Sequence, residues 1–442
     1  MTVFRGSVLH FLDDPGETDD PTAWELFEDG ALVVDDEGKV VFAGHAWAVP
    51  SRLRTGAVTV DHQGYLIVPG FVDTHVHVSE ADIIASYGEQ LLQWLQRYAF
   101  PAEARFGDPA YARAMCAFAL ERMLAAGTTT ASVHTSLHPG SVDAFFEQAQ
   151  QRNLRMLGGK VLMDRESTTP DYLRDDSVQA AETQTRELID RWHGRGRLGY
   201  SISPRLALTC TEDMLTMVAR LHRERPDVWI QTHAAENPQE IAQVREIYGG
   251  RSYIDVYDRF GLLTDKSLFA HCVHIDDADR ARMAATGSSI AFCPDSNMFL
   301  GSGLFDIEAA WRQGVTVGLG SDIAGGTSYS QLYQLNHAYK VAQLRGGRLS
   351  AYRGFYLATL GGARALRLDE HIGSFRPGKE ADFTVLDFTA TPVLAHRTEA
   401  ADTFTERLFA LMVLGDEQAV AATYVLGRPA YERSRTRCGH RP

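Results

Sequence analysis

Eight short β-rich segments alternate with helix-like segments through the middle of the chain, and this alternation restricts the possible folds more than any other feature. Such alternation is typical of parallel sheets whose strands are joined by crossover helices. Eight strand and helix units close naturally into a barrel, so we predict an α/β, TIM-like (β/α)8 barrel over residues 67–373. The predicted strands are residues 70–73, 128–133, 156–162, 198–203, 228–232, 267–270, 289–292 and 315–320.

The segments between these strands carry residues that commonly begin helices. Ser141 and Thr211 are good N-cap residues, and each is followed by an acidic residue within the next turn. We therefore predict that helices begin at these two positions. The full set of predicted helices is residues 109–126, 141–152, 177–193, 211–223, 238–248, 276–285, 305–313 and 329–343.

The two ends of the chain differ from its middle, because both consist of short apolar runs separated by turn sequences. Asp35-Asp36-Glu37-Gly38 separates two such runs near the start, and Gly427-Arg428-Pro429 marks a turn near the other end. Chain termini often lie close together in folded domains. We therefore predict a small discontinuous β-sandwich domain built from residues 1–66 and 374–442.

Composition limits the partners and the compartment. With 45% hydrophobic and 23% charged residues, the 442-residue chain is typical of globular proteins. A formal net charge of -14 argues against nucleic acid or an anionic membrane as a partner and favours a small-molecule substrate. The sequence has no evident signal peptide or apolar run of membrane-spanning length, so we expect a cytoplasmic protein. The five cysteines form no CxxC motif, which favours reduced thiols; they are Cys116, Cys210, Cys272, Cys293 and Cys438.

The first barrel strand ends in the sequence His75-Val76-His77, which places two imidazoles on one face of the chain. An HxH pair alone fits two unrelated histidines just as readily. Here, however, His233 follows the fifth predicted strand and Asp322 follows the eighth, and these strand ends meet at one face of a barrel. Three imidazoles and a carboxylate suit a catalytic zinc with one open position, although iron or cobalt accepts the same ligands.

Three further residues suggest chemistry at that face. Glu236 lies three residues after His233 and can transfer protons there, or it simply begins a helix. His271 follows the sixth strand and can contact the reacting group, or it is a core histidine. Arg205 follows the fourth strand and offers a planar donor fork to a ligand, or it forms a salt bridge at the rim. Lys160 lies too early in its strand to bridge two metals, so we predict one zinc per subunit.

These motifs resemble the amidohydrolase superfamily in its single-metal deaminase branch, and finer motifs resemble the guanine deaminases. The likeness runs over nearly the whole chain, and the stretches around FPAE and DVYDRFGLLT are more specific than the barrel motifs. The motifs are PGFVDTHVH (69–77), FPAE (100–103), SPR (203–205), QTHAAENPQEI (231–241), DVYDRFGLLT (255–264), CPDSN (293–297) and VGLGSDIAGG (317–326).

The resemblance implies hydrolytic deamination of guanine to xanthine and ammonia in purine catabolism or salvage, by a homodimer. It implies that zinc is held by His75, His77, His233 and Asp322, and that Glu236, Asp322 and His271 are catalytic, with Glu236 and Asp322 transferring protons. It also implies that Arg205 meets the purine carbonyl. The predicted substrate-binding residues are Glu80, Trp94, Arg205, Leu206, His233, Glu236 and His271.

Three positions depart from the family pattern. Glu80 stands where a Gln is usual, Leu206 where a Phe is frequent, and Asp295 where Ser or Thr is expected. An ionised carboxylate only accepts hydrogen bonds, so a ring nitrogen facing Glu80 must carry hydrogen. The sequence therefore leaves open a related heterocycle, such as 8-oxoguanine, a pterin or a triazine. A non-catalytic binding protein would lack the complete ligand set, and a cyclic-amide hydrolase would carry a bridging Lys at a strand end.

Overall fold

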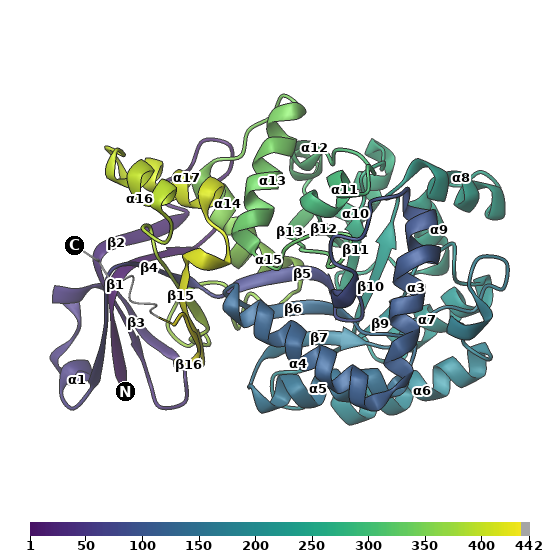
Figure 1. Cartoon of the computed structure of the whole chain (residues 1–442), viewed down its shortest axis with the longest axis horizontal. Helices are drawn as coiled ribbons and strands as arrows, with labels where there is room; N and C mark the ends of the chain where they lie inside the picture. The colour runs from purple at the N-terminus through teal and green to yellow at the C-terminus, as the bar shows by residue number, and fades with distance from the viewer. Residues whose placement is uncertain (435–442) are drawn as a thin grey trace, which may run out of the picture.

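The computed structural model describes residues 1–434, which form a barrel and a smaller sheet-rich region beside it (Figure 1). The predicted free thiol of Cys438 lies outside these residues. Within the described range, Cys116, Cys210, Cys272 and Cys293 are free and buried, as the cysteine spacing predicted. None of the helices described is both long enough and apolar enough to span a membrane.

Eight parallel strands of the described chain form the barrel, as predicted, in the order in which they follow one another in the sequence. The amide of Asp322 donates to the carbonyl of His75 at 2.8 Å, and the amide of His77 donates to the carbonyl of Ile323 at 3.1 Å, which joins the last strand end to the first. The strands are β5 (Phe71–His77), β6 (Thr128–His134), β7 (Arg155–Gly159), β9 (Gly199–Pro204), β10 (Trp229–Ala234), β11 (Ser267–His271), β12 (Ser289–Phe292) and β13 (Thr316–Leu319).

The predicted third strand is interrupted. Residues 156–162 were expected to be continuous, but Lys160 separates β7 from the two-residue strand β8 (Val161–Leu162). The interruption has a local cause, because the amide of Lys160 donates to the Tyr200 hydroxyl at 3.1 Å and not to a neighbouring strand. Lys160 directly follows β7, at its carboxyl end, so the expectation that it lies early in its strand is wrong. Its buried amine is held by the Asp175 carboxylate and donates to the carbonyl of Val161 at 3.3 Å.

Helices surround the barrel (Figure 1). Thr211 caps its helix as predicted, accepting from the Met214 amide at 3.2 Å. Ser141 does not, because Pro139 is the first helical residue and Ser141 lies inside the first turn. The helices are α2 (Leu91–Trp94), α3 (Phe100–Ala104), α4 (Pro109–Ala125), α5 (Pro139–Gln151), α6 (Val178–Trp192), α7 (Glu212–Glu224), α8 (Pro238–Ile247), α9 (Tyr253–Phe260), α10 (Asp277–Thr286), α11 (Pro294–Phe299), α12 (Ile307–Arg312), α13 (Gln331–Leu344), α14 (Ala351–Tyr356) and α15 (Gly362–Ala365).

Strands from both ends of the described chain form a second, mixed sheet, as predicted for a discontinuous domain. Hydrogen bonds join its seven strands edge to edge, and the sheet folds over on itself as the predicted sandwich requires, because the ring of Phe4 packs 4.8 Å from that of Phe383 and 5.1 Å from that of Tyr424. Strand β4 (Val58–Pro69) pairs with β14 (Phe383–Leu386) and so unites the two ends. The other strands are β1 (Thr2–Phe11), β2 (Trp24–Val34), β3 (Val40–His45), β15 (Val420–Val425) and β16 (Arg428–Glu432).

The C-terminal part also contains α16 (Pro392–Glu399) and α17 (Phe404–Leu414), in addition to the strands that its short apolar runs predicted. Helix α17 packs against α13 and α14 of the middle segment. The division into residues 1–66 with 374–442, and 67–373, stays our proposal for the domain boundaries.

Buried charges join the barrel to the mixed sheet. Arg155 of β7 donates to Glu380 through Nε at 2.7 Å and through Nη2 at 2.5 Å. Arg197 reaches the same carboxylate at 2.9 Å and also pairs with Asp382 just before β14. Although burial raises it, hydrogen bonds from Arg155 and the charge of Arg197 hold the pKa of Glu380 at about 2. This cluster therefore stays ionised and paired at neutral pH.

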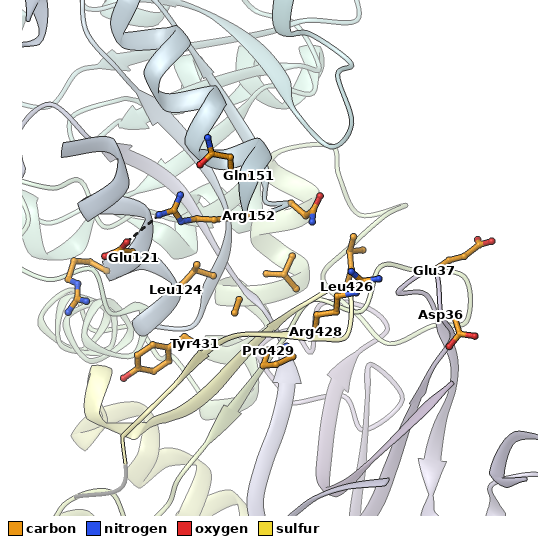
Figure 2. Close-up of a pocket in the computed structure, with 14 residues that line it drawn as sticks. Asp36, Glu37, Glu121, Leu124, Gln151, Arg152, Leu426, Arg428, Pro429 and Tyr431 are labelled. Atoms are coloured by element: carbon orange, nitrogen blue, oxygen red, sulfur yellow. Dashed lines mark hydrogen bonds and ion pairs between the residues drawn. The ribbon is translucent and has the colours of Figure 1, made fainter. Parts of the chain in front are cut away.

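A hollow of about 760 Å³ lies between the ends of α4 and α5 and the β15–β16 hairpin (Figure 2). Its wall is charged, with Glu121 and Arg152 paired at 3.2 Å on the barrel side and Arg428 on the hairpin side. The hollow shares no lining residue with the cleft at the carboxyl ends of the barrel strands.

Candidate active site

Four metal-capable side chains converge at the carboxyl ends of the barrel strands, as the sequence predicted. They are His75 and His77 at the end of β5, His233 on β10 and Asp322 after β13, and all four are buried. Their nearest ligand atoms lie within 4.8 Å of one another. His75 Nε2 lies 3.1 Å from Asp322 Oδ1, and His77 Nε2 lies 3.1 Å from His233 Nε2. The barrel thus brings together groups far apart in the sequence.

The protonation of these histidines fits a cation between them. His233 Nδ1 lies 2.7 Å from the carbonyl of Arg205, which can only accept, so Nδ1 donates and Nε2 presents its lone pair. Burial, together with the neighbouring histidines, lowers the pKa of His77 and His233 well below its ordinary value. Burial raises the pKa of Asp322, but His75 and His271 hold it below its usual value, so the carboxylate is ionised. Three imidazoles and one carboxylate are a suitable donor set for zinc.

The backbone at these strand ends is held in an unusual conformation. Ala235, His271 and Asp322 all have positive φ angles, of 49°, 70° and 50°, which are uncommon for residues other than glycine. Behind Asp322, the carboxylate of Asp73 accepts from the amide of Ser321 at 2.9 Å and from its hydroxyl. Strained backbone of this kind persists only where surrounding contacts fix it, and it gathers at functional sites.

Glu236 and His271 lie beside Asp322, as predicted. His271 Nε2 is 3.4 Å from Glu236 Oε2 and 3.8 Å from Asp322 Oδ2. Burial, reinforced by the charge of Asp322, raises the pKa of Glu236 to about 8, so this acid carries a proton at neutral pH. Ser302 donates to Glu236 Oε1 at 2.9 Å. Glu236 and His271 can therefore supply a proton donor and a hydrogen-bonding imidazole to a group held near Asp322.

The cleft above these residues is nearly filled by side chains. Its free space is about 20 Å³, roughly the room that one water molecule needs. Trp94 of α2 and Leu206 line it, as predicted, together with Leu91, Leu95 and Leu300. The apolar wall therefore lies opposite the polar strand ends.

Arg205 lies between two carboxylates at the edge of the cleft. Its Nη2 donates to Glu80 Oε1 at 2.8 Å, and its Nη1 donates to Glu103 of α3. All three side chains are buried. Burial raises the pKa of Glu80 to about 7, against the opposing charge of Arg205. The predicted donor fork thus has a second partner, Glu103, that the sequence analysis did not assign.

A model of the amidohydrolase family matches residues 66–430, a range that contains every residue of this site. The chain belongs to the amidohydrolase family. It is 48% identical to a guanine deaminase of Escherichia coli K12, over 98% of each chain. Its fold superposes on a solved structure of E. coli guanine deaminase with a TM-score of 0.93 and 46% identity, over 98% of this chain and 100% of the other. A guanine deaminase from C. acetobutylicum, solved with guanine in its active site, gives a TM-score of 0.88 at 27% identity, over 97% and 100%.

In this amidohydrolase, one of the three departures lies outside the cleft. Asp295 accepts from the Thr327 hydroxyl at 2.8 Å and from its amide, so it anchors the loop after Asp322. Glu80 and Leu206 do line the cleft. The sequence analysis missed Glu103 and Asp73 as supporting groups, although both lie in quoted motifs, FPAE and VDTHVH. An acidic residue inside an otherwise apolar run was the available indication.

Proposed function

We propose that this amidohydrolase hydrolytically deaminates guanine to xanthine and ammonia, with one zinc ion per subunit held by His75, His77, His233 and Asp322. The main support is the convergence of this donor set with Glu236 and His271 in one buried cleft. Relatives of up to 48% identity over nearly the whole chain that are named guanine deaminase favour this substrate. Metal-capable residues and a protonated acid side by side are what hydrolysis of an amidine carbon requires.

A zinc ion held there lowers the pKa of a bound water from 15.7 toward about 7. In our proposal, Asp322 accepts one proton as the water oxygen bonds to C2 of guanine. Glu236 gives its proton to N3, which becomes the N3–H of xanthine. Asp322 then passes its proton to the leaving amine, so ammonia departs as the C2–N bond breaks. Glu236 recovers a proton from the hydroxyl that becomes the C2 carbonyl, and both side chains return to their starting state.

His271 holds the reacting group in this scheme. Its Nδ1 donates to Asn297 Oδ1 at 2.9 Å, which fixes the ring and leaves the Nε2 lone pair facing Glu236 and Asp322. An imidazole in this tautomer accepts a hydrogen bond from the N–H or O–H at the attacked carbon. The ring therefore orients the reacting atoms.

Arg205 and Glu80 recognise the far edge of the purine in our proposal. Arg205 retains N–H groups beyond those given to Glu80 and Glu103, and these suit a carbonyl oxygen. The free space of the cleft is far smaller than a purine, so binding requires α2, with Leu91 and Trp94, to move outward. Once closed again, these apolar side chains exclude bulk water from the reacting atoms.

The alternative heterocycles are not favoured. These substrates were considered because the Glu80 carboxylate cannot donate a hydrogen bond to a ring nitrogen. Here, however, Arg205 pairs with Glu80 and places its own N–H groups at the same edge of the cleft. The relative that is 48% identical over nearly the whole chain also carries the name guanine deaminase.

The test is ammonia release by the zinc-loaded protein from guanine, 8-oxoguanine and a pterin in parallel, with Glu80→Gln as the matched variant. We expect guanine to give the highest kcat/KM in both proteins. An inert guanine that becomes a substrate only in Glu80→Gln would keep the site chemistry and overturn the substrate.

Three finer statements stay predictions. They are the homodimer, which sedimentation would test, the cytoplasmic location, and the place in purine catabolism. The preference for zinc over iron or cobalt is likewise proposed, and metal analysis of the purified protein tests it.

A further inference from the structure

A second group of metal-capable atoms shares Asp322 with the first group. It consists of His271, Cys293 and Asp322, whose ligand atoms lie within 4.8 Å of one another and whose side chains are all buried. Cys293 follows β12 directly, so its side chain lies next to those that follow β11 and β13. The proposed catalytic scheme gives Cys293 no role.

The atoms of this group are free to bind a cation. Within residues 1–434, His271 Nε2 is buried and has no hydrogen-bond partner, because the ring is held only through Nδ1 by Asn297. The thiol of Cys293 donates to the carbonyl of Ala291 at 3.5 Å, which is its one side-chain hydrogen bond among the described residues. Asp322 has a second oxygen, Oδ2, which faces His271 at 3.8 Å. Glu236 Oε2 lies 3.4 Å from the same His271 nitrogen and could complete the set.

We propose that His271, Cys293 and Asp322 form a second, weaker site for a thiophilic divalent cation, such as cadmium or excess zinc, and that its occupation inhibits the enzyme. Ligand atoms around a tetrahedral cation with sulfur, nitrogen and oxygen donors lie about 3.3 to 3.6 Å apart, so only small side-chain movements are needed. On binding, the thiol loses its proton to solvent and the thiolate bonds to the metal, with no change in oxidation state.

Inhibition follows from the groups that the second cation would use. It would take the His271 lone pair, which our proposed function assigns to the reacting group, and it would share Asp322, which that function assigns to proton transfer. Inhibition therefore rests on the proposed function, whereas the metal site itself does not. A single thiolate ligand also distinguishes the two sites, because the donors of the first are all nitrogen and oxygen.

The thiolate provides a direct spectroscopic test with Co²⁺. The protein should carry Cys438→Ser, so that the thiol outside the described residues does not contribute. After metal removal with a chelator, Co²⁺ is added stepwise while absorption and ammonia release are recorded. We expect the first equivalent to restore activity without a sulfur-to-metal charge-transfer band. Further Co²⁺ should then produce that near-ultraviolet band and lower the activity at least about tenfold.

Cys293→Ser is the decisive variant, and Cys116→Ser, a buried cysteine of α4, is its matched control. Cys293→Ser should lose the band and the inhibition by added metal, whereas Cys116→Ser should keep both. A band that persists in Cys293→Ser, that is absent from the parent protein at excess Co²⁺, or that forms with the first equivalent would overturn the second site. Because the band is read without substrate, a failure of guanine turnover would not imitate any of these results.

Crystals of the parent protein soaked in Cd²⁺ supply a measurement that does not depend on folding of the variant. Anomalous scattering should give two peaks per chain, one among His75, His77 and His233 and one beside Cys293 Sγ. A single peak among the three histidines at high Cd²⁺ would contradict the proposal.

Discussion

Buried carboxyl groups occur in two regions of this protein, and their pKa values shift in opposite directions in the two regions. At the boundary between the barrel and the mixed sheet, Glu380 and Asp382 are surrounded by Arg155 and Arg197, and the pKa of Glu380 falls to about 2. At the carboxyl ends of the barrel strands, the pKa of Glu236 rises to about 8. There, among the described residues, His75 Nε2 and His271 Nε2 have no hydrogen-bond partner.

The difference separates stabilising charges from functional ones. Leaving a buried polar group without a partner costs about 1 to 3 kcal/mol, so a fold tolerates several together only where a ligand can satisfy them. At the boundary between the barrel and the mixed sheet, each carboxylate already has an arginine counter-charge, so no ligand is needed to neutralise it. The comparison therefore predicts that changes in the site affect activity, and that changes at the boundary affect stability.

Metal removal should produce the largest effect. Dialysis against a chelator should reduce kcat/KM by at least about 10⁴-fold, since the proposed nucleophile loses its activation. It should also lower the unfolding free energy, by about 4 kcal/mol at metal concentrations 1,000 times the Kd. Metal content, ammonia release and calorimetry before and after zinc is added back test both effects. A metal-free protein with full activity would refute the metal assignment.

Glu236→Gln should abolish most activity with little change in stability. The amide cannot give the ring nitrogen a proton, so kcat should fall by about 10²- to 10⁴-fold. Because Glu236 is already neutral at pH 7, the nearly isosteric amide should leave the thermal midpoint within about 2 °C. Steady-state kinetics and thermal unfolding of the same preparation provide the comparison. A variant that keeps more than a tenth of the activity would exclude Glu236 as the acid.

Glu380→Gln should lower stability and leave activity unchanged. Removing this charge leaves Arg155 largely buried without its counter-charge, although Arg197 keeps Asp382, and this should cost about 3 kcal/mol of unfolding free energy. The kcat/KM of the folded protein should stay unchanged. Glu212→Gln is the matched control, because its pair with Arg259 at 3.9 Å is exposed and should cost under about 0.5 kcal/mol. Equal losses in the two variants would remove the distinction between paired core and surface charges.

Lowering the pH should also weaken the contribution of this charge cluster to stability. Because the pKa of Glu380 in the folded protein is about 2 and its ordinary value is 4.5, its contribution is complete above pH 4.5 and is lost as the pH falls toward 2. The loss amounts to at most about 3 kcal/mol. Urea unfolding between pH 5 and 3 should therefore show a shallower dependence in Glu380→Gln than in the parent protein. Parallel curves would assign the pH dependence to other carboxylates.

Much of the site could be predicted because each metal-capable residue directly follows a β-rich run. His75, His77, His233, His271 and Asp322 are recognisable in that way, and parallel strand ends necessarily meet at one face of a barrel. Glu103 could not be assigned by the same rule, because it lies in α3 and its role depends on meeting Arg205 in space. Cys293 does follow a β-rich run, but only the structure shows that its sulfur lies near His271 and Asp322.

Some predicted element boundaries were wrong because a single residue had more influence than the sequence pattern around it. Pro139 begins α5 ahead of Ser141, because its fixed φ suits the first helical position. Lys160 interrupts the third strand because its amide donates to the Tyr200 hydroxyl and not to a neighbouring strand.

The sequence by itself determined the barrel, the union of the two chain ends and the identity of the metal-capable residues, since these follow from periodicity and from the position of polar residues after strands. The tertiary structure alone decided the electrical state of those residues. Burial, and the presence or absence of a counter-charge in space, leaves Glu236 protonated at neutral pH, with a pKa of about 8, and Glu380 ionised, with a pKa of about 2. Two glutamates with the same intrinsic chemistry thus differ because desolvation and pairing depend on neighbours that are remote in the chain.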